Sequence, residues 1–410
     1  MNKIILLIVP FLLFSKSYII SDIPLPKLYI QNLDPYECNE ECMQNYLDNG
    51  MIFYFLAQAD KILENREHNN IRTMNISLLN LNIYKKGDGL RIAMILPYKK
   101  IGKYASSTMN ATFAYLITKD YPFELKSYKV ESENIEDLED TINRIKQDGF
   151  HYIIAPLTQY GADNISIINP DINIYFPTIN KKDIATSSAF LFYGGIDYKA
   201  QSDLLLEKAV SPLVIFHDKS SLGNKLAFYE ENRFRDMNSS TTDNPFLYEE
   251  SLPNRVIKFS LARRTTNLEK YLKENDKLSD ASFFLNTPIV KSGMVMSQLT
   301  LYDTNVTNIL STQINYDPLI LSMTQYTDRK KMIIANSITE EDNLLIESNA
   351  LLGNDIVFDW INYTTTIGID YFFHLITGEE LNYTIPMRDN QMVYKIELLK
   401  PSISRFIKHR

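Results

Sequence analysis

Cys38 and Cys42 are the only thiols in the 410-residue chain. The C-x3-C spacing places both sulfurs on one side of a helical turn, or across a tight loop just before a helix. An even number of cysteines in an exported chain favours a disulfide. A metal site would need two more ligands nearby, and the nearest histidine is His68. We therefore predict a Cys38–Cys42 disulfide and no metal site.

Residue types that act in catalysis are present, but not in their usual arrangements. The chain contains no G-x-S-x-G, H-E-x-x-H, G-x-x-x-x-G-K-[ST] or C-x-x-C motif. Its five histidines are isolated in the sequence, and carboxylate pairs such as Glu340-Glu341 are common in any acidic chain. With only 13 glycines, few glycine-rich loops could bind phosphate. We expect a non-catalytic protein without a cofactor.

Charge and length narrow the choice of partner. Fifty acidic residues against 42 basic ones give a net charge of −8, and nucleic-acid binding favours the opposite sign. The 45% hydrophobic content is ordinary for a globular protein. At roughly 100–200 residues per domain, the length suggests two or three domains.

The first 17 residues predict a secretory signal peptide. Lys3 precedes the apolar stretch 4–14, and small residues surround the expected cleavage point after Ser17. Eleven apolar residues span about 16 Å as a helix, roughly half of a bilayer core, which argues against a membrane anchor. No cysteine stands at the cleavage point, so we expect no lipid anchor there. We expect the mature chain in the periplasm, with no transmembrane segment.

The pattern changes at Leu90. We predict helices over residues 39–47 and 51–65, and a polar connector over residues 67–89. After Leu90, short apolar strands alternate with amphipathic helices in two consecutive series of about five strands each. This alternation predicts an α/β fold with two similar lobes.

Three stretches of these series share a pattern with a known family: residues 91–97 before the helix at Ala105, residues 192–197 with Gln201, and residues 212–219 with Gly223. Their order and spacing resemble those of the type I periplasmic binding proteins, the leucine/isoleucine/valine-binding-protein-like family. The resemblance covers about residues 90–400 and none of 18–89. It implies two Rossmann-like lobes with parallel sheets, joined by a multi-strand hinge that includes Gly194 and Gly195. The helical extension that precedes them is predicted from the residue pattern alone.

The residue pattern and this likeness together give the expected domain boundaries. Residues 1–17 are the signal peptide, and residues 18–89 are the helical extension with the disulfide. Lobe 1 is expected to hold residues 90–193 plus about 335–378. Lobe 2 is expected to hold residues 197–325 plus about 380–400.

Folds of this kind bind ligands at the carboxyl ends of strands that face the cleft between the lobes, where helix N-termini offer free N–H groups. The candidate ligand contacts are therefore residues that follow strands. Lobe 1 contributes Tyr98, Lys99, Tyr104, Thr158, Gln159, Thr178 and Asn180, and lobe 2 contributes Asp218, Lys219, Ser220, Asn286 and Thr287. Helix capping is the alternative role for the Ser, Thr and Asn residues among them.

The sequence departs from the amino-acid-binding members of that family at two places. An aromatic residue usually stands just before the glycine that corresponds to Gly223, and here the residue is Leu222. The small-residue loops that hold the amino acid are replaced by residues 158–160 and 178–180. Specificity for α-amino acids is therefore in doubt.

Three N-x-[ST] sequons carry an acidic residue two positions before the asparagine, at Asn238, Asn305 and Asn382. This extended form resembles the acceptor of some bacterial glycosylation systems. In an Asn-rich chain such matches also arise by chance, and the intact mass of the native protein distinguishes the two explanations.

Two functions fit these features. The first is a cell-envelope regulator or scaffold that docks a protein partner. The resemblance extends to the lipoprotein activators of penicillin-binding proteins, which also place helices ahead of such a lobe pair, although this chain lacks their lipid-attachment motif. The second is a periplasmic receptor that binds a small polar solute for an ABC transporter or a sensor. We favour the regulator.

Overall fold

The structure is a computed structural model that describes residues 30–34, 36, 38–59, 62–79, 81, 89–119, 121–237 and 254–409. The expected signal peptide and Asn238 lie outside the described residues. The chain divides into two compact units. The helical unit takes Glu37–Lys85 and the chain up to Gln31, and the two-lobe unit takes Asn32–Tyr36 and Lys86–Arg410.

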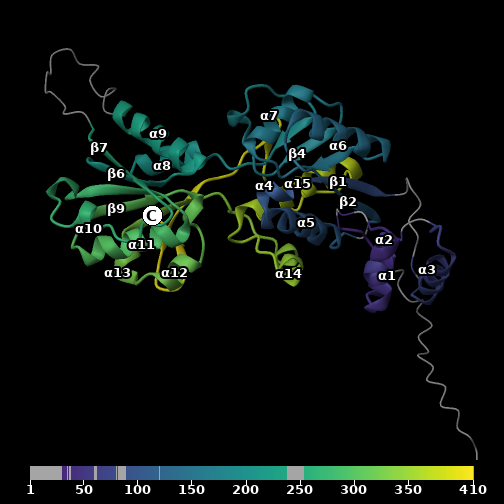
Figure 1. Cartoon of the computed structure of the whole chain (residues 1–410). Coiled ribbons are helices and arrows are strands. Elements are labelled where there is room, and N and C mark those ends of the chain that lie inside the picture. Colours follow the sequence, from purple (N-terminus) through teal and green to yellow (C-terminus); the bar gives the residue numbers. More distant parts are fainter. Residues whose placement is uncertain are drawn as a thin grey trace, which may run out of the picture. The chain divides into compact units, whose positions relative to one another are not determined.

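The helical unit contains α1 (Glu40–Asp48), α2 (Ile52–Gln58) and α3 (Arg66–Leu78) (Figure 1). Phe55 and Leu56 of α2 pack with Met43 of α1 in a small core of their own. The helix expected over residues 51–65 ends at Gln58, and α3 forms where the sequence predicted a connector. The reason is that α3 is polar over most of its surface, so its sequence carries only a weak helical period.

Lobe 1 is built on a seven-stranded sheet in the order β11-β12-β5-β4-β3-β1-β2. The strands are β1 (Leu90–Leu96), β2 (Phe123–Lys129), β3 (Tyr152–Ile154), β4 (Asn173–Phe176), β5 (Leu191–Tyr193), β11 (Met387–Arg388) and β12 (Gln391–Met392). Strands β1 to β5 are parallel, and only β11 runs antiparallel to its neighbour. Its helices are α4 (Tyr98–Ile101), α5 (Lys103–Leu116), α6 (Ile135–Gln147), α7 (Gln159–Ile168), α14 (Asn343–Leu351) and α15 (Trp360–Thr377), with the 3₁₀ turn η1 (Lys181–Asp183).

Lobe 2 repeats the plan with the order β14-β13-β10-β9-β8-β6-β7. The strands are β6 (Leu213–Asp218), β7 (Val256–Leu261), β8 (Ala281–Asn286), β9 (Val306–Ser311), β10 (Met332–Asn336), β13 (Glu397–Pro401) and β14 (Phe406–Lys408). The helices are α8 (Tyr198–Leu206), α9 (Ser221–Asp236), α10 (Glu269–Leu272), α11 (Ile289–Leu301), α12 (Leu319–Met323) and α13 (Tyr326–Arg329), with the 3₁₀ turns η2 (Asp276–Leu278) and η3 (Gln313–Asn315).

Each sheet has an apolar core on both faces, because its strands are apolar at successive positions. In lobe 1, Ile92 and Met94 face α5 and α15, and Ala93 and Ile95 face α6 and α7. Figure 1 shows the same plan in lobe 2, where α8 and α9 cover one face and α11 to α13 the other. The predicted fold class, two α/β lobes after a helical extension, is confirmed.

Three segments cross between the lobes, after β5, after β10 and after β12. The last crossing corrects an expected boundary. Residues from about 380 onward were assigned to lobe 2, but β11 and β12 pair in the sheet of lobe 1. Both strands have two residues, too few to show a period in the sequence. Among the described residues, no helix combines the length and the apolar run that crossing a bilayer requires.

Candidate functional site

The segment that follows β1, where ligand contacts were expected, is helical. Tyr98 and Lys99 lie on α4, and Tyr104 lies in the first turn of α5. The Tyr98 ring centroid lies 6.2 Å from that of Tyr36, which belongs to the same unit. Burial, followed by the nearby Asp34 carboxylate, raises the pKa of the Tyr98 hydroxyl to about 12. Tyr98 is therefore partly covered by the chain's own N-terminal segment.

Lys99 lies on the surface and forms an ion pair with Glu131. Glu131 also accepts a bond from Lys129, at 2.6 Å. The two ammonium groups, with Lys129 contributing more, hold the pKa of the Glu131 carboxyl at about 2. Lys99 and Lys129 therefore share the single carboxylate of Glu131.

The candidates after β3 and β4 hold their own loops together. The backbone N–H of Thr158 donates to the Glu133 carboxylate at 2.8 Å, and the Thr158 hydroxyl donates to its other oxygen. The Gln159 amide donates to the backbone oxygen of Asp183 at 2.7 Å. The Thr178 hydroxyl donates to the backbone oxygen of Leu157 at 2.8 Å. These bonds fasten the strand ends of lobe 1 to one another.

Asn180 and the two expected hinge glycines form one packed joint. The Asn180 amide donates to the backbone oxygen of Gly195 at 3.0 Å. A Cβ on Gly194 would lie 1.9 Å from the Tyr175 hydroxyl, and a Cβ on Gly195 would lie 2.3 Å from the carbonyl carbon of Ile179. Close approach therefore requires glycine at both positions. The hinge role of the two glycines stays a prediction.

In lobe 2, three candidates shape the start of α9. The Ser220 hydroxyl accepts from the backbone N–H of Gly223 at 3.0 Å and so caps the helix. The same hydroxyl donates to Asp218 at 2.5 Å. Lys219 is exposed, and its backbone oxygen accepts from Asn224 at 3.3 Å. For Ser220 the contacts show the capping role.

Asn286 and Thr287, at the end of β8, are buried in the interior of lobe 2. The Asn286 amide donates to the Glu230 carboxyl at 2.5 Å, and the Ser202 hydroxyl donates to its other oxygen at 3.1 Å. Burial raises the pKa of the Glu230 carboxyl well above its ordinary value. The Thr287 hydroxyl lies 2.7 Å from that of Ser292. Sequence reasoning missed Glu230, because nothing in the sequence marks one glutamate of α9 as buried.

A further polar network joins α8 to the second crossing and was also missed. The backbone N–H of Gln313 donates to the Gln201 side chain at 2.9 Å, and Gln201 donates to the Ser337 hydroxyl at 2.7 Å. Gln313 in turn donates to Asn336 at 2.9 Å. All four residues are buried. The network fixes α8, η3 and the crossing after β10 in one arrangement.

Both lobes line a small recess beside the first crossing. Asn180 and Asp183 reach it from lobe 1, and Lys225 and Tyr229 reach it from α9 of lobe 2. Its volume is about 30 Å³, whereas sites for small molecules typically measure ~300–1,000 Å³. Lys225 bridges the recess to Asp183 at 2.6 Å. The recess has room for water rather than for an amino acid.

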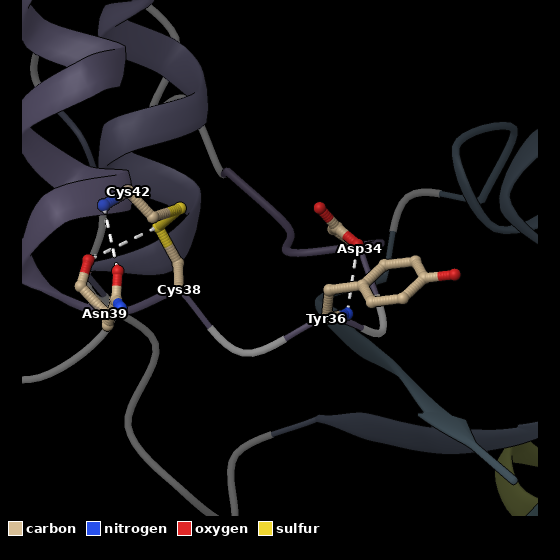
Figure 2. The surroundings of a disulfide bond; sticks show 5 residues. All are labelled: Asp34, Tyr36, Cys38, Asn39 and Cys42. Carbon is tan, nitrogen blue, oxygen red and sulfur yellow. Dashed lines mark hydrogen bonds between the residues drawn. A yellow bond between two sulfur atoms is a disulfide. The ribbon is translucent and has the colours of Figure 1, made fainter. Parts of the chain in front are cut away.

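The disulfide prediction is confirmed. Cys38 and Cys42 are bonded, with 5.3 Å between their Cα atoms. Figure 2 shows the pair at the start of α1, where the Asn39 side chain accepts from the backbone N–H of Cys42 at 2.9 Å. Among the described residues, no three His, Cys, Asp or Glu side chains gather in a way that could hold a metal ion.

Two lobes of this topology, joined by three crossings, define the fold of the type I periplasmic binding proteins. A substrate-binding protein of an ABC transporter from Sphaerobacter thermophilus superposes with a TM-score of 0.58 and 12% identity, over 78% of this chain and 96% of its own. No protein-family model matches the sequence, and no curated protein matches it.

LpoA from Haemophilus influenzae shares the fold over a longer stretch. The full-length protein superposes with a TM-score of 0.52 and 11% identity over 90% of this chain, which spans 65% of LpoA. Its C-domain, described as a regulator of PBP1A, superposes with a TM-score of 0.50 and 10% identity over 78% of this chain and 100% of its own. These neighbours are described as a substrate-binding protein of a transporter and a regulator of PBP1A.

Proposed function

We propose that this protein is a non-catalytic regulator or scaffold of the cell envelope that docks a protein partner in the periplasm. Enzymes of peptidoglycan synthesis are the first partner class to test. The second candidate is a solute-binding receptor for an ABC transporter or a sensor. The two candidates share the fold and differ in what the face between the lobes does.

The main support for the proposal is that expected ligand-contact residues form hydrogen bonds within the protein. Thr158 is bonded to Glu133, Asn180 to Gly195, and Asn286 to Glu230, all within the protein. A solute would have to replace these bonds, and breaking a buried hydrogen bond without a substitute costs about 1–3 kcal/mol for each polar group. These three side chains instead support the strand ends and helices around them.

The share of the chain that the structural matches cover supports the same proposal. The match to the transporter component covers 78% of this chain, whereas the match to full-length LpoA covers 90% and so extends beyond the two-lobe unit. A helical unit ahead of the lobes adds surface for a second protein. A solute receptor needs no such addition.

Site-directed photo-crosslinking in intact cells tests the docking. A photoreactive amino acid replaces Tyr160 of α7 or Phe228 of α9, both of which are exposed. Matched positions on the same helices, Ser166 and Phe234, are buried and serve as controls. We expect at least one exposed position to give a discrete crosslink to one envelope protein that the buried positions do not give. A set of exposed positions, extended to the helical unit, that gives no crosslink contradicts the proposal.

A thermal-shift screen tests the solute receptor. A ligand at one hundred times its Kd stabilises the folded state by about 2.7 kcal/mol, which shifts the melting temperature measurably. Amino acids, short peptides, sugars and muropeptides form the panel. The proposal expects no saturable shift. A saturable shift with one class of solute would instead support the receptor.

A further inference from the structure

The lobes touch each other through charged side chains on one face of their sheets. The Asp183 carboxylate of lobe 1 accepts from Lys225 of α9 at 2.6 Å and lies 4.0 Å from Lys199 of α8. Lys182 of lobe 1 pairs with Asp197, the cap of α8, at 2.5 Å. We call these five residues the ionic clasp. It joins η1 of lobe 1 to the first two helices of lobe 2.

The lobe 1 end of the ionic clasp is held firmly. The backbone oxygen of Asp183 accepts from the Gln159 amide, and the Asn180 side chain caps η1 by accepting from the backbone N–H of Lys182 at 3.1 Å. The side chains of Asp183 and Lys225 are only 31% and 38% exposed. Partial burial reduces the screening of the pair by water and salt. The Asp183–Lys225 ion pair therefore links α9 of lobe 2 to a well-anchored segment of lobe 1.

A second contact between the lobes is aromatic. The ring of Phe358, which precedes α15 of lobe 1, lies 5.1 Å from the Tyr316 ring and 6.1 Å from the Phe406 ring. Tyr316 and Phe406 belong to lobe 2 and lie 4.9 Å apart. Burial, followed by the carboxylates of Glu341 and Asp355, raises the pKa of the Tyr316 hydroxyl to about 12. We call the three rings the aromatic clasp.

The two clasps lie on opposite faces of the sheets. Tyr316 and Phe406 pack in the cluster that contains Phe216 of β6. Helices α8 and α9 pack in the other cluster, which contains Ile215. Successive side chains of a strand point to opposite faces, so the two clusters cover the two sides of the lobe 2 sheet.

The same separation holds in lobe 1. Ile184, directly after Asp183, packs with the cluster under α6 and α7, whereas Trp360, two residues after Phe358, packs with the cluster under α5 and α15. A rotation that separates the lobes on one face therefore presses them together on the other. Opening toward either face must break one of the clasps.

We infer that the ionic and aromatic clasps lock the two lobes at one angle, so that the two-lobe unit is a rigid body. A third contact agrees with this arrangement, because the rings of Tyr198 in α8 and Trp360 in α15 meet edge to face at 6.0 Å. The inference concerns motion within the protein and holds whichever partner or solute the protein binds.

Distances between spin labels test the lock directly. The two native cysteines are joined in the disulfide, so Asn143→Cys in α6 and Asn232→Cys in α9, both exposed, add two labelling sites to the full chain. We expect one narrow distance distribution for the labelled protein. The double variant Asp183→Asn with Phe358→Ala should broaden the distribution or add a second peak. Circular dichroism confirms that each variant is folded.

Matched controls change similar contacts that do not cross between lobes. Asp171→Asn removes an ion pair with Lys146 inside lobe 1, and Tyr271→Ala removes a ring contact of 4.9 Å with Phe259 inside lobe 2. Both should leave the distribution unchanged. A broad or two-peaked distribution in the protein with both clasps intact overturns the lock. A folded double variant with the original distribution overturns it as well.

The response to salt provides a second readout. At 1 M ionic strength the screening length falls to about 3 Å, which weakens the half-exposed ionic clasp. In the Phe358→Ala variant, where only that clasp remains, added salt should broaden the distribution. The salt response should be smaller once Asp183→Asn is also present, because only the Lys182–Asp197 pair of the clasp then remains. Equal salt responses in the two variants contradict the role of the ionic clasp.

Discussion

The Asn286 amide and the Glu230 carboxyl lie 2.5 Å apart in the interior of lobe 2. Asn286 ends β8 at a position where a solute contact was expected, and its side chain supports α9 instead. Both residues are almost fully buried. A glutamate kept in this environment makes lobe 2 sensitive to pH.

Replacing Glu230 by glutamine should stabilise the protein at neutral and higher pH. Burial raises the folded-state pKa of Glu230, so the folded protein holds a proton that the unfolded chain has already released. The unfolding free energy of the native protein therefore falls as pH rises above about 4.5 toward the folded-state pKa. Glutamine is neutral at every pH. Its oxygen accepts from Ser202, and its NH2 group donates to the Asn286 oxygen once the Asn286 amide is flipped. We expect a gain of about 1–3 kcal/mol at pH 8 and little change at pH 4.

Urea unfolding at several pH values measures this difference. Glu207 is exposed and directly follows α8, so Glu207→Gln serves as the control. It should change the unfolding free energy by less than about 0.5 kcal/mol at both pH 4 and pH 8. A Glu230→Gln variant with the same unfolding free energy as the native protein at every pH contradicts the prediction. So does a variant that is less stable at pH 8.

Substituting alanine at Gly194 should disrupt the joint after β5. The added Cβ would lie 1.9 Å from the Tyr175 hydroxyl and 2.4 Å from the ring carbon that carries it. Overpacking of this kind typically costs 1–3 kcal/mol. Gly353→Ala is the control, because no atom lies within 4 Å of its Cβ position and only its left-handed backbone, φ +73°, opposes alanine. Thermal unfolding should show the larger loss at Gly194, and equal or reversed losses would contradict the packing argument.

Arg329 should matter for the C-terminal hairpin. Its buried guanidinium donates to the backbone oxygen of Ile403 at 2.8 Å, to that of Ser402 at 3.1 Å, and to that of Thr324. Arg329→Met leaves these oxygens without a donor, and we expect a loss of about 2–4 kcal/mol. Hydrogen exchange should speed up in residues 402–405. The exposed Arg264→Met is the control, and similar exchange in the two variants would disprove the anchoring role.

The disulfide should stabilise the helical unit alone. Cys38 and Cys42 close a short ring, for which the chain-entropy estimate is about 2 kcal/mol. We expect the double serine variant to lower the melting transition of the helical unit and to leave that of the two-lobe unit unchanged. Calorimetry of the full chain measures both. A shift of the larger transition by the same amount would show that the two units unfold together.

Much of the fold was predictable because its strands are buried on both faces. Runs such as Leu90–Leu96 and Leu213–Asp218 are apolar at most successive positions, and the helices between them are amphipathic. Helix α3 was missed because only a few of its side chains reach a core. Strands β11 and β12 were assigned to the wrong lobe because two residues carry no period and pairing alone decides their place.

The roles of the candidate site residues were less predictable. Strand ends and helix starts can be located from the sequence, and this places Thr158, Ser220 and Asn286 correctly on the chain. Their bonding partners come from elsewhere: Glu133 lies 25 residues before Thr158, and Glu230 lies 56 residues before Asn286. Such pairs depend on how helices pack on the sheet, which a local pattern does not contain.

Binding between the purified full chain and the envelope protein that crosslinks to it tests the central claim most directly. Biolayer interferometry with the immobilised chain measures the affinity, and the solute panel is added in parallel. We predict saturable binding of the protein partner, with no saturable response to any solute. Failure of the protein to bind, together with saturable binding of one small solute, would contradict the docking function and establish a receptor.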